Sequence, residues 1–188
     1  MYDVDWDENA RLDESCAVLT KINDMPPVLQ TVLALDAWNN LALLQHAPWL
    51  GRLLAPSLLH QAGLSNGGHL FALNIGLKIV PVECRRHRDR NIRLSAILHG
   101  FAVAAELGMR EHDRLTLART MMERRLVGRR TSSRRPGLID LLIAQPLVSA
   151  EMVAGNLDVT PRAALRLIDE LGPCEITGRS RFRAWGVI

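Results

Sequence analysis

Arginines near the C-terminal end have the types and spacing of groups that contact nucleic acid. Arg162 and Arg166 lie four residues apart in a segment with helical periodicity, and Arg179, Arg181 and Arg183 follow in a segment with strand-like alternation. A guanidinium presents a planar fork of donors that fits phosphate oxygens and guanine edges. Like charges four residues apart repel slightly in an isolated helix, and a polyanion lying along that helix would offset this cost. The spacing therefore predicts DNA contacts.

The elements that must position these arginines form a predicted winged helix-turn-helix in residues 137–188. Three segments with helical periodicity are bracketed by capping residues, glycines and prolines, namely 138–144, 150–157 and 161–171. The third is the predicted recognition helix. Thr160 offers it a capping hydroxyl, Pro161 suits its first position, and Gly172 ends it. Its apolar stripe of Ala164, Ile168 and Leu171 is expected to pack on the first two helices.

A two-stranded wing is predicted after this helix, with strands at 174–177 and 181–185 around a turn at 178–180. Period-two alternation sends the two arginines of the second strand to one face, and Phe182 and Ala184 to the face that closes the core. The arginines would then lie beside a phosphate backbone. The predicted partner is double-stranded DNA, and the predicted contact residues are Thr160, Arg162, Arg166, Arg179, Arg181 and Arg183.

Two other interpretations of this module stay open. Arg166 could pair with Glu170 on a solvated helix face, which is a common arrangement. A winged module can also serve as a protein-docking or dimerisation domain without binding DNA. Because one winged module covers few base pairs, a homodimer is expected if the protein does read DNA as a transcriptional regulator.

An arginine-rich linker is predicted at residues 127–136, between a helical domain at 1–126 and the winged module at 137–188. Such a stretch can track DNA phosphates as an arm, or it can be only a soluble hinge. The arm residues would be Arg129, Arg130, Arg134 and Arg135.

Charge is divided unequally along the chain. Residues 1–84 hold four basic and nine acidic side chains, whereas residues 85–188 hold nineteen basic and eleven acidic ones. Arginine supplies 21 of the 23 basic groups. The half that contains the winged module is thus the basic half, as an electrostatic footprint for DNA requires.

The N-terminal domain is predicted to be helical, with no strand before residue 174. Apolar density indicates a core helix at 28–44, another at 50–62 and a short element at 70–80. Two further helices are expected at 92–107 and 111–126, separated by Gly108.

Composition favours an intracellular, non-enzymatic protein. The three cysteines are far apart and odd in number, which suits a reducing compartment. The N-terminus is acidic where a signal peptide would be basic, and no apolar run reaches the roughly 18 residues that span a bilayer, so we expect a cytoplasmic location and no membrane partner. Cys84 and His87 have the spacing of half a zinc site, but no second pair follows. No cofactor, metal or catalytic motif is predicted.

The segment Ala47–Leu64 resembles the part of Fic-domain proteins where the catalytic loop meets the next helix, and the later helices and winged module follow the order of Fic proteins with a C-terminal winged helix. The resemblance implies a degenerate Fic-like N-terminal domain. Of the family's loop only Gly51-Arg52 matches. Leu41 stands where the histidine base is needed, and Pro48 has no amide to offer a phosphate. A Fic-like protein without nucleotidyl transfer is therefore implied.

The chain is also similar to an uncharacterised, often plasmid-borne family of rhizobia and related alphaproteobacteria, in which a helical domain precedes a C-terminal helix-turn-helix. The similarity lies in the segments 46–54, 111–115 and 181–186. Members of that family extend further at the N-terminus, which would make Met1 the start of a shorter form. This resemblance implies the two-part architecture and leaves the activity open.

Overall fold

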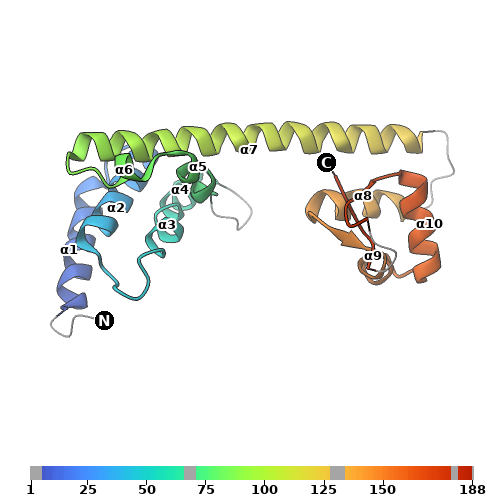
Figure 1. Cartoon of the computed structure of the whole chain (residues 1–188), viewed down its shortest axis with the longest axis horizontal. Helices are drawn as coiled ribbons and strands as arrows, with labels where there is room; N and C mark the ends of the chain where they lie inside the picture. Colours follow the sequence, from blue (N-terminus) through green and yellow to red (C-terminus); the bar gives the residue numbers. More distant parts are fainter. Residues whose placement is uncertain (1–5, 66–70, 128–133, 179–181, 188) are drawn as a thin grey trace. The chain divides into compact units, whose positions relative to one another are not determined.

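A computed structural model describes residues 6–65, 71–127, 134–178 and 182–187, and this part of the chain is mostly helical (Figure 1). Contacts divide the chain into two compact units, Met1–Gly108 and Met109–Ile188. The boundary falls inside the helix α7 (Arg90–Leu126), which supplies buried side chains to the core of each unit. The prediction of a mainly α protein with a C-terminal winged helix-turn-helix is confirmed.

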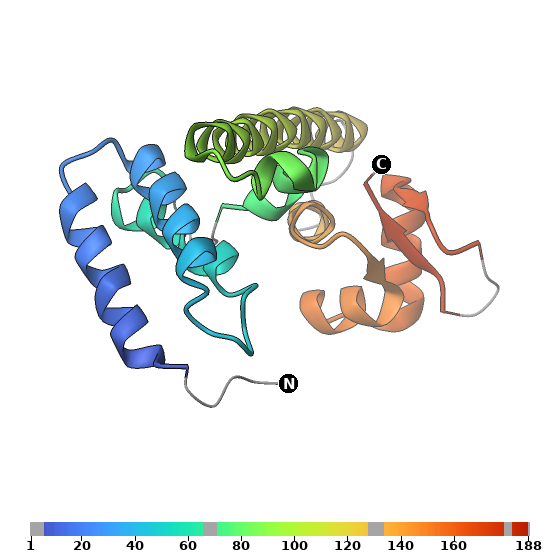
Figure 2. The ribbon, with the colours of Figure 1, turned by 60° about the vertical axis from the view of Figure 1, so that its left-hand side comes forward.

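The N-terminal unit consists of short helices and the first half of α7. α1 and α2 pack along each other (Figures 1 and 2). The predicted helix at 50–62 is instead two short helices, because Pro56 between them cannot donate a backbone hydrogen bond. The bounds are α1 (Glu8–Ile22), α2 (Pro27–Leu41), α3 (Gly51–Leu54), α4 (Ser57–Gln61), α5 (Leu73–Ile79) and α6 (Val82–Arg85).

The core of this unit joins α2, α4, α5 and α7. α5 and α7 approach so closely that a Cβ on Gly76 would lie 1.9 Å from the Gly100 carbonyl oxygen, so only glycine fits there. Asp36 of α2 is buried, and its Oδ1 accepts a hydrogen bond of 2.7 Å from Arg93 Nε of α7. The principal buried apolar side chains are Val32, Leu35, Leu59, Leu73, Leu77, Ile97 and Phe101.

α7 corrects the prediction of two helices separated by Gly108. The helix runs unbroken from Arg90 to Leu126. A glycine costs about 1 kcal/mol relative to alanine inside a helix, but it ends one only when it takes a left-handed conformation, and Gly108 does not have a positive φ. Good helix formers on both sides, Glu106 to Glu111, carry the helix through this position.

Within the described residues, α7 is long and apolar enough to cross a membrane by length and composition alone, with a mean hydropathy of 1.3 over its most apolar 18 residues. The expectation that no such run exists was therefore wrong. Ile97, Phe101 and Ala104 of this helix are buried in the N-terminal unit. Of that 18-residue segment, 28% is buried.

The C-terminal unit adds a winged helix-turn-helix to the second half of α7. Its elements are α8 (Arg135–Ala144), β1 (Val148–Ser149), α9 (Ala150–Leu157), α10 (Pro161–Leu171), β2 (Cys174–Glu175) and β3 (Ala184–Gly186). The strands form an antiparallel sheet in the order β1-β3-β2. β1 corrects the expectation of no strand before residue 174. With two residues, it is too short to show alternation, and it forms because Val148 pairs with Trp185.

The face assignment of the second wing strand was wrong for Phe182, which is 90% exposed. Its φ of 56° is left-handed, so the extended alternation predicted for 181–185 is broken at this residue. The strand begins only at Ala184, and Trp185 is the side chain that closes the core, at 3% exposure.

Candidate DNA-binding interface

The recognition helix α10 is defined at both ends by local contacts. Thr160 lies in extended backbone at the N-cap, and its Oγ1 accepts a hydrogen bond of 3.3 Å from Ala163 N. Gly172 ends the helix with a φ of 65°, in the left-handed region that suits glycine. Both boundaries agree with the predicted ones, and the predicted cap is confirmed.

The turn between α9 and α10 is held from outside the motif. Asp158 ends α9 with a φ of 49°, which an aspartate tolerates better than most residues. Arg134, which precedes α8, donates from Nη1 to the Asp158 carbonyl oxygen. The turn is therefore supported by a side chain from the stretch that was predicted to be either a DNA-binding arm or a soluble hinge.

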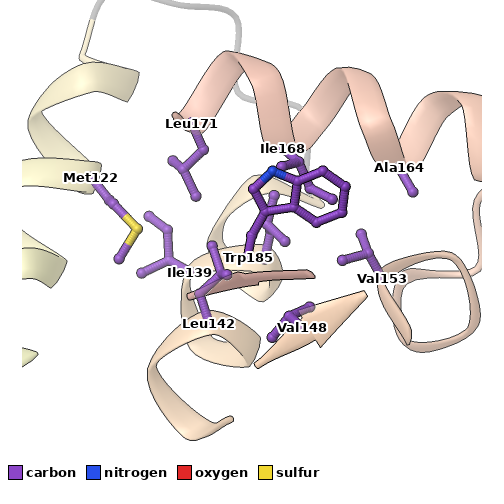
Figure 3. Close-up of a cluster of buried hydrophobic side chains, with 10 residues drawn as sticks. Met122, Ile139, Leu142, Val148, Val153, Ala164, Ile168, Leu171 and Trp185 are labelled. Atoms are coloured by element: carbon purple, nitrogen blue, oxygen red, sulfur yellow. The ribbon is translucent and has the colours of Figure 1, made fainter. Parts of the chain in front are cut away.

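One apolar core holds the module together. Ala164, Ile168 and Leu171 of α10 are almost completely buried, which confirms the predicted stripe. Figure 3 shows Trp185 beside Ile168, and Met122 of α7 pointing toward Ile139 of α8. Because these contacts fix the inner face of α10, its opposite face is presented to solvent as a rigid surface.

Arg162 and Arg166 lie on that outer face. Both are exposed, and the Arg166 side chain is 82% exposed. Arg166 Nε donates to Glu170 Oε1 at 3.2 Å, so the pairing that the sequence left open is present. Arg162 has no ion pair with any residue that the structure describes.

Glu170 is the centre of the charge arrangement on α10, and sequence reasoning did not identify this role. Arg135, the first residue of α8, donates to Glu170 Oε2 from Nη2 at 2.7 Å and from Nε at 3.2 Å. The guanidiniums of Arg135 and, to a smaller degree, Arg166 hold the pKa of the Glu170 carboxyl below its usual value. Arg135 therefore ties α8 to α10.

The wing holds one of its predicted contact residues by internal contacts. Arg183 Nε donates to Glu175 Oε2 at 2.9 Å, and the guanidinium lies 5.0 Å from the centroid of the Trp185 ring. The base of the wing is closed by Ile176 N donating to Ala184 O at 2.9 Å. Arg179 and Arg181, like Arg129 and Arg130 of the predicted arm, lie outside the described residues.

The second half of α7 contacts the module through side chains for which the sequence predicted no such contact. Arg125 Nη1 donates to the carbonyl oxygens of Leu171 at 2.7 Å and Gly172 at 3.0 Å, at the end of α10 where helical carbonyls lack partners. Arg114 Nη1 donates to Val187 O at 2.7 Å, next to β3. For Arg125, its place in the last turn of α7 was the available signal, but its partners are distant in sequence.

The residues proposed for other chemistry have structural surroundings of their own. A Cβ on Gly51 would lie 2.4 Å from the Trp38 ring, so the glycine of the Fic-like segment is required for packing. His87 Nδ1 accepts from Asp89 N at 3.0 Å. Within the described residues, no group of three or more histidine, cysteine, aspartate or glutamate side chains is arranged to hold a metal ion.

Comparisons with known proteins agree with this architecture. Residues 1–127 match a family model described as a protein of unknown function (DUF1612), and residues 135–188 match one described as an HTH DNA binding domain. The chain is 62% identical over 188 residues to the uncharacterized protein y4cF of Sinorhizobium fredii, a match that covers 100% of this chain and 50% of the relative. The chain thus spans about half the length of the curated relative it matches. It belongs to the DUF1612 family of proteins of unknown function and carries a helix-turn-helix DNA-binding domain at its C-terminal end.

Proposed function

We propose that this protein is a transcriptional regulator that reads DNA with α10 and acts as a cytoplasmic homodimer without catalytic activity. The observation that carries the proposal is the outer face of α10, where Arg162 and Arg166 are exposed on a helix whose inner face is completely packed. A recognition helix in this setting enters the major groove with residues of its N-terminal half. Arg162 is the second residue of the helix, so it is the first base contact we expect.

Among the described residues, the wing contributes less to this proposal than α10 does. Arg183 is held against Glu175, which lowers the net charge that it offers to a phosphate. Arg134 and Arg135 are engaged with Asp158 and Glu170, so we assign them to positioning rather than to direct DNA contact. A dimer would place two recognition helices on half-sites about one helical turn of DNA apart.

The test is binding of the whole chain to duplex DNA, measured by fluorescence anisotropy across a salt series. Arg162→Gln/Arg166→Gln should lower the affinity at every salt concentration and reduce the salt slope by up to about two, since each lost phosphate contact contributes about one. If either residue reads a base instead, its loss should cost about 1–3 kcal/mol and relax sequence preference.

The matched control is Arg52→Gln/Arg86→Gln, which removes the same charge from exposed positions of the N-terminal unit. Its salt slope should stay at the wild-type value. No binding at low salt, or an equal loss in both double variants, would contradict the proposal. The absence of binding would favour the alternative in which the winged module docks a protein partner, and an equal loss would show that the DNA contacts are not specific to α10.

A further inference from the structure

The N-terminal unit contains a basic cleft where α2, α3, α5, α6 and the start of α7 meet. Its volume of about 770 Å³ lies in the range of sites that bind small molecules. No aspartate or glutamate lines it. Its lining includes the arginines Arg52, Arg85, Arg86, Arg88 and Arg93.

Two of these arginines are engaged by the fold, and three are not. Arg93 pairs with the buried Asp36, and Arg85 Nε donates to Val80 O at 3.1 Å. The side chains of Arg52, Arg86 and Arg88 are exposed and have no hydrogen bond or ion pair with any residue that the structure describes. Three guanidiniums at one cleft therefore keep their donors available.

Hydrogen bonds hold the loop between α6 and α7, residues 86–89, in place. Arg93 Nη1 donates to the carbonyl oxygens of His87 at 2.8 Å and Arg88 at 3.2 Å, and Asp89 Oδ1 accepts from Asn91 N at 2.8 Å. The loop is thus fixed at both ends of its turn. The Asp89 carboxylate also accepts from Ile92 N at 3.5 Å, so it caps the first turn of α7.

Aromatic and amide groups accompany the charges. Trp49 is 51% exposed at the cleft, and Trp38 also lines it. The indole Nε1 of Trp38 is buried and has no hydrogen-bond partner within the described residues. Asn39 and Asn40 supply further donors and acceptors. Rings and amides beside arginines suit a ligand that combines a flat ring with an anionic group.

We propose that this cleft binds a small molecule that carries a phosphate group and a flat ring. A phosphate monoester carries a charge of about −1.5 to −2 near neutral pH and three acceptor oxygens, which matches several unpaired guanidiniums better than a single carboxylate does. None of the residues that line this cleft is among the proposed DNA contacts. The test of small-molecule binding is therefore independent of the test of DNA binding.

The experiment is isothermal titration calorimetry of the whole chain at low salt with phenyl phosphate, inorganic phosphate and benzoate. Phenyl phosphate should bind saturably and more tightly than either of the others, because only it supplies both ring and dianion. Arg52→Gln/Arg86→Gln should weaken its binding at least about tenfold, since charge-assisted hydrogen bonds are lost. Circular dichroism would verify folding, and each single variant serves if the pair does not fold.

The control pair is Arg110→Gln/Arg124→Gln, which removes two exposed arginines of the other unit and should leave phenyl phosphate binding within about twofold of wild type. Three results would overturn the proposal. Phenyl phosphate could fail to bind saturably at concentrations up to about 10 mM, its binding could be weakened equally by both pairs of substitutions, or benzoate could bind as tightly.

The phosphate groups that these arginines bind could also belong to DNA. The DNA titration distinguishes DNA from a small molecule as the source of the phosphate. An unchanged DNA salt slope in Arg52→Gln/Arg86→Gln supports a small-molecule site. A slope reduced by about two would assign the cleft to the DNA backbone instead and overturn the proposal.

Discussion

At Glu170, one carboxylate receives two arginines that come from different elements. Arg135 and Glu170 are both mostly shielded, with exposed side-chain fractions of 18% and 22%, whereas Arg166 is 82% exposed. Shielding strengthens the first pair, because water and salt screen it less. At the residue scale, the arginines of the module therefore differ: Arg135 stabilises the fold, and Arg166 stays available at the surface.

Glu170→Gln should lower the free energy of unfolding of the C-terminal unit by about 1–2 kcal/mol at pH 7, because charge-assisted hydrogen bonds to Arg135 are lost. The pKa of Glu170 is lowered in the folded state, so this stability is present above its unfolded pKa and is lost as pH falls through the folded value. Urea denaturation measures this prediction. The free energy of unfolding should differ between Glu170→Gln and wild type at pH 7, and this difference should become smaller at about pH 3.

Glu151→Gln is the control for this prediction. Glu151 is exposed in the first turn of α9 and has no partner among the described residues, so only a few tenths of a kcal/mol from the helix dipole should change. Equal stability of Glu170→Gln and wild type at pH 7 would show that the pair with Arg135 contributes nothing net.

At the scale of elements, boundaries set by local chemistry were predictable from sequence. Thr160-Pro161 and Gly172 mark α10 to the residue, because caps act on their own neighbours. β1 was missed because a two-residue strand exists only through its partner Trp185. The face of Phe182 was missed for a related reason: a left-handed residue is not visible in an alternating pattern.

The residues of the candidate DNA-binding interface were likewise predictable only where local sequence determines their position. The exposed position of Arg162 and Arg166 follows from helical periodicity, which sequence shows directly. The positioning roles of Arg125 and Arg134 depend on carbonyl groups 46 and 24 residues away along the chain, and no local pattern encodes such contacts.

Two glycines test how the helices of the N-terminal unit are built. Gly108→Ala should raise stability by about 1 kcal/mol, because Gly108 is helical and no atom outside the helix lies within 4 Å of a Cβ there. Gly76→Ala should lower stability by about 2 kcal/mol or more, because its Cβ would collide with the Gly100 carbonyl. Thermal unfolding followed by circular dichroism would measure both, and a destabilised Gly108→Ala would contradict an unbroken α7.

At the scale of the whole molecule, two ways of dividing the chain differ. The matched family models meet near residues 127–135, whereas the compact units meet at Gly108. The division into 1–126, 127–136 and 137–188 rests on linker composition and stays a prediction. The contacts made by Arg114, Met122 and Arg125 explain why the second half of α7 groups with the winged module.

A fragment of residues 109–188 should therefore be more stable than a fragment of residues 135–188. The shorter fragment loses the buried Met122 and the hydrogen bonds to Leu171, Gly172 and Val187, at a combined cost of about 3 kcal/mol or more. Urea denaturation of the two fragments would measure the difference. Equal midpoints would show that α7 adds nothing to the module.

The hydrogen bonds from Arg125 to the end of α10 also affect where this module can be exchanged between proteins by recombination. A recombination joint placed in the arginine-rich linker would separate the recognition helix from the guanidinium that satisfies its last carbonyls. A joint near Gly108 would transfer the winged module together with Arg125. Chimeric proteins that carry this module should accordingly be joined within α7 rather than after it.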